Sequence, residues 1–547
     1  FKKGRHNVMK IVSLGIGLAV GLVLIAKVYF EQSYDDFYPD RDRVYQVWAK
    51  YQQNGGELKD YPQTSGGIAP TMQQQIPEIE TVTRYTSFGD WTFTMTDTKM
   101  KYSGRCIIAD SCFFDILPRP MLIGNAKEVL STPMYVLVSS RIAKNIGGDV
   151  IGKNFTVDSS PGRTMTIGGV FEEVPENSHS RYDVIVSMAS AGRFMWEGSP
   201  TNMLGNDRYI SYVKLHKGVN PLALEEQVHT FVNSYFPPEE QQKTGFNIGF
   251  SFHELDGLHK ELPQVKRMTW ILSLLAFALI FTAVMNYILI VISSIVNRSK
   301  EVAVHKCYGA SENNIHGMMF GEALVHIVLS LILALLLILA FRGTVEELLA
   351  TSLDSLLLSN GSLVLLGICI LVFFVSGFMP GSLYARIPVA SAFRNYRENK
   401  RIWKKALLLV QFVATGFLVT MLVFVARQYT FMVNDRPGYA YENLAYCGLA
   451  GVDSTSRAKI LDEVMRLPGV VAATTVYQLP FEHASGNNIL LPGETQELFN
   501  IADLYWVGNG YLDMMEIPVI QGRSFTENVT NSRAVSYTHL RAHETLS

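Results

Sequence analysis

Two stretches of this chain, residues 268–296 and 406–426, contain no charged side chain. An α-helix rises about 1.5 Å per residue, so either stretch is long enough to cross the roughly 30 Å of hydrocarbon in a bilayer. Residues 362–385 are likewise free of charge. We therefore predict transmembrane helices over these three ranges.

Two further apolar stretches, residues 318–341 and 8–30, also predict spans, because their few ionisable side chains lie towards the ends. A cleaved signal peptide is the alternative for 8–30, but no small-residue cleavage pattern follows it, which favours a retained anchor. Long lysine side chains near the end of a span are expected to reach the head groups. The ionisable residues are Glu322 and His326 in the first stretch and Lys10 and Lys27 in the second.

Lysine and arginine gather before the first span and in residues 297–317 and 386–405. Short cytoplasmic loops collect these residues, so all three segments are predicted to face the cytoplasm, together with the N-terminus. Residues 31–267 and 427–535 would then lie outside. The chain is predicted to carry a large extracytoplasmic domain.

The composition agrees with soluble domains joined to membrane spans. Hydrophobic residues make up 48% of the chain and the mean hydropathy is +0.15, yet 18% of the residues are charged. The 47 lysines and arginines nearly balance 49 aspartates and glutamates, which argues against a nucleic-acid partner. The five cysteines are scattered, and we expect free thiols rather than a zinc site or a Cys106–Cys112 disulfide.

The outside segment 31–267 mixes strand and helix patterns. β-branched and aromatic stretches predict strands, and apolar residues at helical spacing predict helices. The predicted fold class is a multi-pass α-helical membrane protein with large α+β extracytoplasmic domains. Strands are expected at 44–48, 165–167 and 209–215, and helices at 65–75, 139–146 and 222–235.

The chain also repeats itself at low identity, with a shift of 511 − 113 = 398 residues. The first span corresponds in order to the fifth, since each leads into an outside domain. We therefore predict a tandem internal duplication. The matched residues are Phe113, Asp115, Pro120, Leu122 and Gly124 in the first copy and Tyr511, Asp513, Pro518, Ile520 and Gly522 in the second.

The second copy is expected to be incomplete, with its outside domain confined to 427–535. Residues 536–547 continue no pattern of that domain and resemble translated sequencing-adapter sequence, so we expect a non-native tail. His539 and His543 have the spacing of half a metal site on a helix, but the foreign tail is favoured.

Four polar side chains fall inside the predicted spans: Asn286, Glu322, His326 and Gln411. We expect them to make interhelical hydrogen bonds, because an unpaired polar group is costly in lipid. A proton relay through Glu322 and His326, as in a proton-coupled carrier, is the alternative. Two glycines on one face of the first span, Gly17 and Gly21, would admit a close helix from this chain or from a second copy.

Residues 147–154 nearly match the P-loop spacing, in which glycine amides and a lysine hold phosphate. Asn154 stands in place of the magnesium-binding Ser or Thr, and the segment is predicted to lie outside the cytoplasm. We predict a turn there, and no cofactor or metal in this chain. Residues 175–179, which end at His179, likewise fit turn chemistry better than a catalytic site.

Five segments keep a fixed order along the chain: residues 13–19, 33–39, 151–153, 169–179 and 297–311. Together they resemble the MacB/FtsX-type permeases of ABC transporters, in the duplicated form with two MacB-like periplasmic core domains and here C-terminally truncated. There are departures from the family pattern. His305 stands where the family usually has arginine, and Cys307-Tyr308 replaces an aliphatic pair.

The resemblance implies that residues 297–317 form a cytoplasmic coupling segment that docks on an ATPase. By its own residues the segment is a short basic helix that Gly309 ends and Ser311 restarts, and a solvated loop is the alternative. Its charges would set the register, while Val302 and Ala310 would supply contact area. The coupling residues are Arg298, Lys300, Glu301, Val302, His305, Lys306, Gly309 and Ala310.

The resemblance also implies a non-enzymatic permease of the bacterial inner membrane, serving efflux, lipoprotein extraction or mechanotransmission. Its partners would be a cytoplasmic P-loop ATPase, as a dimer that uses ATP and Mg, and a periplasmic or outer-membrane protein. Few polar residues lie in the spans, which favours mechanical coupling over an aqueous channel. The alternative from another class is a membrane-anchored scaffold or sensor that binds an extracytoplasmic partner without an ATPase.

Overall fold

The computed structural model divides the chain into two compact units, Phe1–Phe417 and Leu418–Ser547. The predicted tail at 536–547, with its two histidines, and most of the predicted basic loop at 386–405 lie outside the described residues. The described residues are 2–53, 56, 58–158, 160–205, 207–357, 361–385, 402–434, 438–449, 452–479, 485–490 and 497–521.

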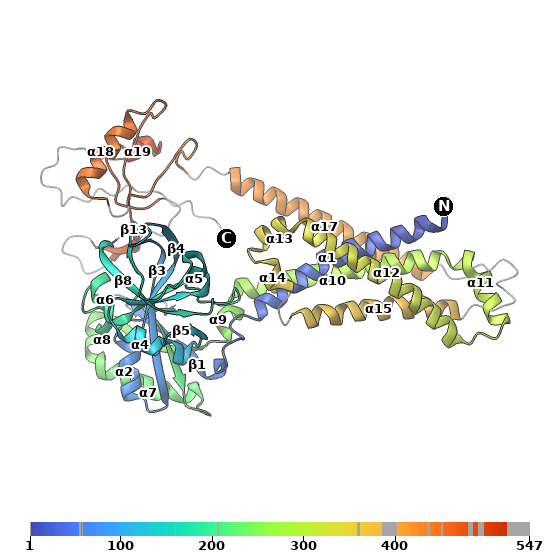
Figure 1. Ribbon diagram of the computed structural model, residues 1–547, viewed down its shortest axis with the longest axis horizontal. Helices are drawn as coiled ribbons and strands as arrows, with labels where there is room; N and C mark the ends of the chain where they lie inside the picture. Colours follow the sequence, from blue (N-terminus) through green and yellow to red (C-terminus); the bar gives the residue numbers. More distant parts are fainter. Residues whose placement is uncertain are drawn as a thin grey trace. The chain divides into compact units, whose positions relative to one another are not determined.

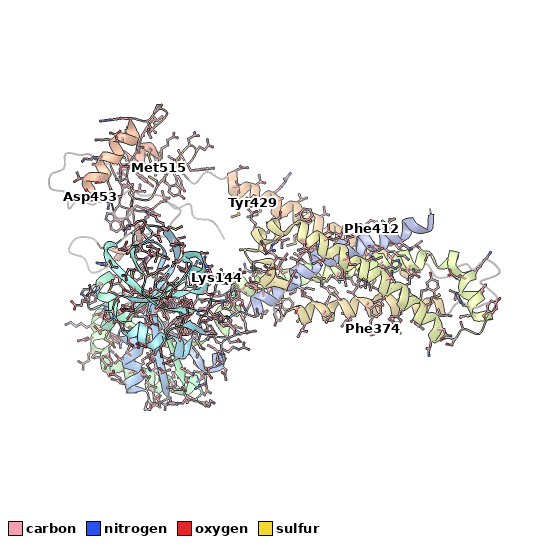
Figure 2. All side chains as sticks on the ribbon, viewed as in Figure 1. Lys144, Phe374, Phe412, Tyr429, Asp453 and Met515 are labelled. Carbon is pink, nitrogen blue, oxygen red and sulfur yellow. The ribbon has the colours of Figure 1, made fainter. Side chains whose placement is uncertain are left out.

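Five helices are long and apolar enough to cross a membrane, and each overlaps a predicted span (Figure 1). Many of their large apolar side chains are exposed, as lipid-facing side chains are. Figure 2 shows two of them, Phe374 and Phe412, which are 55% and 73% exposed. The five helices are α1 (Lys2–Gln32), α10 (Pro263–Ser293), α12 (Glu312–Ala340), α15 (Ser362–Ala385) and α17 (Ile402–Asn434).

Helices α1, α10, α12 and α15 pack around one apolar core. The glycine face of α1 lies against α10, where a Cβ atom at Gly17 would meet Ala283 and one at Gly21 would meet Ile280. Without side chains the two glycines let the helices approach closely. This face is therefore filled from within the chain.

Three short helices connect the long ones. α11 (Ile295–Cys307) joins α10 to α12. α13 (Arg342–Leu349) and α14 (Leu353–Leu357) lie between α12 and α15, and α14 contacts α1.

An α+β domain follows α1 and precedes α10 (Figure 1). Its mixed sheet has the order β11-β1-β10-β3-β4-β9-β6-β8-β5, with β2 on β1 and β7 between β3 and β8. Most neighbouring strands are antiparallel, but β4 and β9 are parallel, as are β6 and β8. The strands are β1 (Val44–Gln53), β2 (Lys59–Tyr61), β3 (Ile79–Met95), β4 (Lys101–Ala109), β5 (Met121–Ile123), β6 (Tyr135–Ser139), β7 (Asn154–Val157), β8 (Ser160–Phe171), β9 (Val184–Ser187), β10 (Ile210–Leu215) and β11 (Phe246–Glu254).

Helices cover this sheet over three apolar clusters. The three predicted helices are present with shorter bounds, as α2 (Ile68–Gln75), α5 (Ser140–Ile146) and α7 (Glu225–Tyr235). α7 starts late because the turn before it, Pro221–Leu224, is a 3₁₀ helix. All five cysteines are free thiols. The remaining helices of the domain are α3 (Phe113–Ile116), α4 (Ala126–Ser131), α6 (Ala191–Phe194), α8 (Pro238–Thr244) and α9 (Gly257–Lys260).

The second unit contains a smaller set of elements. They are α18 (Ser454–Met465), the antiparallel pair β12 (Ser485–Leu490) and β13 (Glu497–Leu504), and α19 (Tyr511–Met514). The side chain of Asp453 caps α18 by accepting from two backbone amides. Tyr511, Leu512 and Met515 are the buried residues of its apolar cluster.

Candidate functional site

Helix α11 contains the segment to which the sequence assigns ATPase coupling. It ends in a glycine turn: Gly309 has φ +88°, a left-handed value that favours glycine, and the Ala310 amide donates to the His305 carbonyl oxygen at 3.0 Å. Ser311 then caps α12, because its hydroxyl oxygen accepts from the Asn314 amide at 3.3 Å. The stop and the restart lie at the residues that the sequence indicates.

The other end of α11 is fixed by the end of α15. Ser294 lies between α10 and α11, and its amide donates to the Val291 carbonyl oxygen at 3.2 Å. The fully buried Tyr384 donates its hydroxyl to the same Val291 carbonyl at 3.2 Å and lies 3.1 Å from the Ser294 hydroxyl. The break between the two helices is therefore held in place by a third helix.

One side of α11 faces the transmembrane helices and the other faces solvent. Val302 and Ala303 are each 1% exposed and belong to the apolar core of the bundle. Lys300, Glu301 and His305 are exposed, as is Gly309, while Lys306 and Ala310 are half-buried. The side chain of Arg298 lies outside the described residues.

The structure corrects one predicted role in this segment. Val302 cannot offer contact area to a partner, because its side chain is buried against the transmembrane helices. Val304 and Tyr308 are the exposed apolar residues near it, with 43% and 89% of their surfaces exposed. The four-residue spacing from Lys300 to Val304 to Tyr308 marks this face in the sequence and would have identified them.

Inside the bundle, two polar residues of α12 contact neighbouring helices. Glu322 accepts from the Lys10 ammonium of α1 at 3.1 Å, where the lysine side chain is only 4% exposed. The ring of His326 lies 3.2 Å from the hydroxyl of Tyr287 on α10. The expectation that Lys10 reaches the head groups is wrong, because a carboxylate on the adjacent helix pairs with it inside the protein.

For the two other predicted intramembrane polar residues the structure gives burial but no hydrogen bond among the described residues. Asn286 on α10 is half-buried. Gln411 on α17 is 7% exposed, and its side-chain nitrogen has no hydrogen-bond partner among the described residues. The structure therefore gives no interhelical partner for Gln411 in that part of the chain.

The place where α1 and α10 meet the domain holds a cluster of ionisable groups, which we call the junction cluster: Lys27, Glu31, Asp36, Arg41, Asp256, His259 and Lys260. In its buried half, Lys27 pairs with Glu31 at 2.7 Å, and the side chains are 9% and 6% exposed. Glu31 Oε2 lies 2.6 Å from His259 Nε2, and the His259 ring stacks on Tyr34 with centroids 3.5 Å apart. Lys27, too, is thus kept from the head groups by partners inside the protein.

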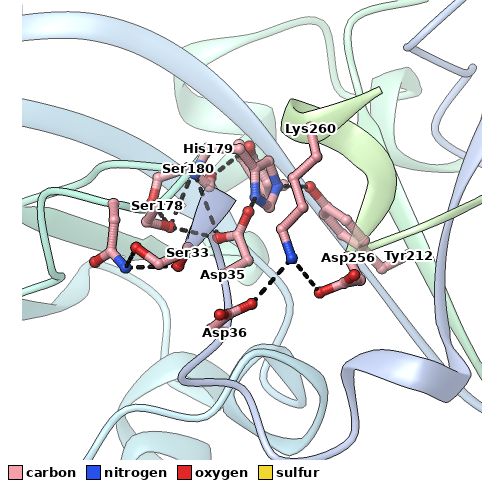
Figure 3. A network of polar contacts seen from close by, with 11 residues as sticks. Ser33, Asp35, Asp36, Ser178, His179, Ser180, Tyr212, Asp256 and Lys260 are labelled. Carbon is pink, nitrogen blue, oxygen red and sulfur yellow. Dashed lines mark hydrogen bonds and ion pairs between the residues drawn. The ribbon is translucent and has the colours of Figure 1, made fainter. Parts of the chain in front are cut away.

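The other half of the junction cluster is partly exposed. Lys260 bridges Asp36 at 3.0 Å and Asp256 at 2.8 Å (Figure 3). Arg41 contacts the same two carboxylates at 2.7 and 3.3 Å. Burial lowers the pKa of Lys260, but its hydrogen bonds to the two aspartates outweigh burial and raise that pKa overall.

The turn after α1 is anchored in the domain by a second polar network (Figure 3). Asp35 is 1% exposed, has a φ of 60°, and accepts from Ser178 at 3.1 Å and from His179 Nδ1 at 2.7 Å. The other ring nitrogen of His179 contacts the hydroxyl of Tyr212. Asn177 donates to the Ser33 carbonyl oxygen at 2.7 Å.

This Asp35–His179–Tyr212 arrangement resembles the acid, histidine and hydroxyl of a hydrolytic triad, but its hydroxyl cannot reach a substrate. Tyr212 is fully buried, and burial raises the pKa of its phenol well above the ordinary value. The network is therefore a structural tie. The sequence does not predict it, since 144 residues separate Asp35 from His179.

A third connection joins the domain to the turn between α13 and α14. The Ser352 amide donates to the carboxylate of Glu176 at 3.0 Å, and Lys27 donates to the Thr351 hydroxyl at 2.8 Å. Thr351 and Ser352 both lie between α13 and α14; Glu176 belongs to the domain, whereas Lys27 belongs to α1. The domain thus contacts the bundle through three separate segments.

No group of three or more His, Cys, Asp or Glu side chains that could hold a metal ion occurs among the described residues. The near-match to a P-loop is a turn after α5: Gly147, Gly148 and Gly152 have positive φ values, and Lys153 donates its ammonium to the Gly147 carbonyl at 3.2 Å. The Lys153 side chain therefore closes the turn by a hydrogen bond to its backbone.

Comparison with known protein families gives two matches along the chain. Residues 9–231 match the MacB-like periplasmic core domain, and residues 273–389 match the FtsX-like permease C-terminal domain. The first match covers α1 and most of the α+β domain, and the second covers α10 to α15. No curated protein sequence matches the chain.

Solved structures similar to part of the chain include three from bacteria. A domain of a Porphyromonas gingivalis protein described as a permease is 32% identical, with a TM-score of 0.37, over 40% of this chain and 91% of that one. The periplasmic region of MacB from Actinobacillus actinomycetemcomitans is 16% identical, with a TM-score of 0.25, over 38% of this chain and 87% of that one. The extracellular domain of the ABC-type transporter YknZ from Gram-positive bacteria is 10% identical, with a TM-score of 0.27, over 38% of this chain and 98% of that one.

Proposed function

This chain belongs to the MacB/FtsX-like family of ABC transporter permeases, and from that premise we propose that it couples ATP hydrolysis by a separate ATPase to movement of its α+β domain. FtsX-like permeases are usually the non-catalytic membrane subunit, so ATP and Mg would be used by the partner. The single observation that carries the proposal is the continuous path from α11 through α10 into the junction cluster.

The proposed orientation places α11 in the cytoplasm and the α+β domain outside the bacterial inner membrane. It is supported by the basic residues before α1, in α11 and between α15 and α17, because short cytoplasmic loops collect lysine and arginine. α10 begins beside the domain and ends at α11. A protein that binds α11 would therefore act on the opposite end of the helix that enters the domain.

The ATPase is proposed to dock on the exposed face of α11. Lys300, Glu301 and His305 supply charge of both signs, which can set the register of the partner. Val304 and Tyr308 supply the apolar area that Val302 does not. An exposed aromatic side chain beside charged residues is typical of the few residues that dominate an interface.

Transmission to the domain is supported by the contacts at the far end of α10. The junction cluster ties the segment that leaves α1 to the segment that enters α10 through three different acid–base contacts. Several of these side chains are largely buried, which reduces screening by water. A shift of α10 along or around its axis would thus move both chain segments that hold the domain.

Efflux, lipoprotein extraction and mechanotransmission all fit this proposal, and we favour mechanotransmission. The support is the apolar character of the bundle: polar contacts such as Lys10–Glu322 and Tyr287–His326 join helices to each other. A water-filled path would need more polar side chains facing it. A periplasmic or outer-membrane partner would receive the movement.

We also propose that the two outside domains arose by tandem duplication. Phe113–Ile116 of α3 and Tyr511–Met514 of α19 are one-turn helices related by the shift of 398 residues (116 + 398 = 514). The antiparallel pair β12–β13 falls where the shift would place part of β3–β4. An experimental structure of the second domain with a different strand order would contradict the proposal.

The coupling proposal is tested by reversing two charges on α11. The variant Lys300→Glu/Glu301→Lys, reconstituted in liposomes with the co-purified ATPase, is expected to lower permease-stimulated ATP hydrolysis about tenfold because an interface charge pattern is inverted. The control is Lys127→Glu/Glu128→Lys, the same adjacent pair exposed on α4 of the domain.

Two results would contradict the proposal. Hydrolysis that both variants stimulate equally would show that α11 does not set the contact with the ATPase. If the wild-type chain co-purified with no P-loop ATPase at all, a scaffold or sensor would explain it better.

A further inference from the structure

A cavity of about 480 Å³ opens on the α+β domain, in a region that the proposed function does not use. Three aromatic rings line it, from Tyr51, Tyr61 and Phe246, together with the side chain of Leu204. Its polar side chains are Gln63 and Asp207. The cavity is thus a mostly apolar hollow with one acidic group.

The aromatic rings come together through the pairing of three strands. β1 pairs with β11 so that Tyr51 lies opposite Ile248 and Gln53 opposite Phe246, and it pairs with β2 so that Ala49 lies opposite Tyr61. The ring centroids of Tyr51 and Phe246 are 5.2 Å apart, and those of Tyr51 and Tyr61 are 5.6 Å apart. Such a cluster brings several rings, whose faces are electron-rich, to one space.

The carboxylate of Asp207 is held in this space by two hydroxyl groups. Tyr51 donates to one carboxylate oxygen at 2.6 Å, and Ser65, which is 2% exposed, donates to the other. Burial, together with the hydrogen bond to Asp207, raises the pKa of Tyr51, so its hydroxyl remains a donor.

Charge decides which ligands this cavity can accept. Among the described residues that line it, Asp207 is the only charged side chain. An anionic ligand would be repelled by that carboxylate. A sugar needs many hydrogen-bond partners, whereas the polar side-chain groups that line this cavity are the Gln63 amide, the Tyr61 hydroxyl, and the Tyr51 hydroxyl and Asp207 carboxylate that already bond to each other.

We propose that this cavity binds a small organic cation of the quaternary ammonium class, with the methyl groups against the aromatic rings and the charge beside Asp207. Aromatic side chains attract a cation within about 6 Å of the ring centroid, and a fixed carboxylate adds a charge contact. The proposal stands apart from ATPase coupling, since the cavity involves neither α11 nor the junction cluster.

The test compares choline with its neutral isostere 3,3-dimethyl-1-butanol, which has a carbon in place of the ammonium nitrogen. Binding to the full chain in detergent is measured by ligand-observed NMR and calorimetry. Choline is expected to bind saturably and at least about tenfold more tightly than the isostere, because only choline gains from the rings and the carboxylate. Equal affinities would overturn the proposal.

Three variants locate the site. Asp207→Asn is expected to weaken choline binding at least about tenfold and to remove the preference over the isostere. Tyr61→Leu changes a side chain that is 37% exposed on a short edge strand, so it tests the ring without risk to the core, and the same weakening is expected. Asp158→Asn, at a carboxylate held by Thr94 and Lys101, is the matched control and should bind as the wild type does.

Choline binding that survives both Asp207→Asn and Tyr61→Leu would overturn the assignment. So would a loss of binding in Asp158→Asn equal to that in Asp207→Asn, because the effect would then be one of overall charge.

Discussion

At the scale of single residues, the pair Lys10–Glu322 is the clearest case of a buried charge that needs its partner. Removing Lys10 takes away a charge that compensates Glu322 inside the protein, whereas removing both members can be nearly neutral. Lys10→Met is therefore expected to cost about 3 kcal/mol of stability. The double variant Lys10→Met/Glu322→Gln should regain most of it, as measured by thermal unfolding in detergent.

The control for this pair is Lys101→Met, which breaks an ion pair with Asp158 whose side chains are 66% and 30% exposed. Such an exposed pair is worth less than about 1 kcal/mol. A double variant at positions 10 and 322 that is no more stable than Lys10→Met would contradict the role given to the pair.

His253 makes the folding stability of the domain depend on pH. Its ring stacks on Trp48 with centroids 4.1 Å apart, and burial lowers its pKa below the ordinary value of 6.5. The folded state therefore favours the neutral ring: the stability from this site is complete above pH 6.5 and is lost as the pH falls through the lower pKa of the folded protein.

His253→Phe should keep the stacking and flatten the loss of stability between pH 7 and pH 5, measured as the unfolding midpoint in detergent. His229→Phe, at an exposed histidine on α7, should leave the pH dependence of the wild type unchanged. An identical pH dependence in His253→Phe and the wild type would exclude this site as the cause.

At the scale of elements, the contact between α1 and α10 depends on two positions that carry no side chain. Gly17→Leu is expected to force the helices apart and to lower stability by about 1–3 kcal/mol, because overpacking displaces neighbours that have no room. Gly367→Leu on α15 is the control, since a Cβ atom there meets nothing within 4 Å. Equal unfolding midpoints for the two variants in detergent would count against the close contact.

The sequence predicts the elements better than it predicts the contacts between them. The spans follow from composition alone, since an uncharged stretch of that length has few alternatives to a membrane helix. The glycine stop and serine cap of α11 follow from local backbone chemistry. The junction cluster does not, because His259 meets Glu31 across 228 residues and Lys260 meets Asp36 across 224.

Burial explains the wrong or incomplete predictions at the candidate site. Val302 and Val304 are the same residue type two positions apart, and only the packing of α11 on the bundle decides which one is exposed. Lys10 and Lys27 likewise look like head-group contacts until the partners on other segments are known. Local patterns carry no information about these distant partners.

At the scale of the whole molecule, the junction cluster should pass motion from α10 to the domain. Spin labels attached to Leu122→Cys and to the native Cys307 would report the distance between the domain and the end of α11. The other exposed cysteine is first removed by Cys447→Ser. With the ATPase bound, ATP is expected to change that distance in the wild type. The double variant Glu31→Ala/His259→Ala should lose most of the change, because a buried tie between the two segments is gone.

The matched control is Lys266→Ala, which breaks a largely exposed ion pair with Glu261 beside the same boundary and should keep the full distance change. A distance change of wild-type size in Glu31→Ala/His259→Ala, with the ATPase still bound, would show that the domain moves by another route.

Tyr384 has a consequence for the timing of any such movement. Its hydroxyl holds the Val291 carbonyl and the Ser294 hydroxyl, so α11 can turn about this break only after both contacts are given up inside an apolar core. Displacements of a bound partner that are too small to break these two contacts would leave the angle between α11 and α10 unchanged. The bundle would then respond in steps, with a threshold set by one phenol group, and would ignore fluctuations below it.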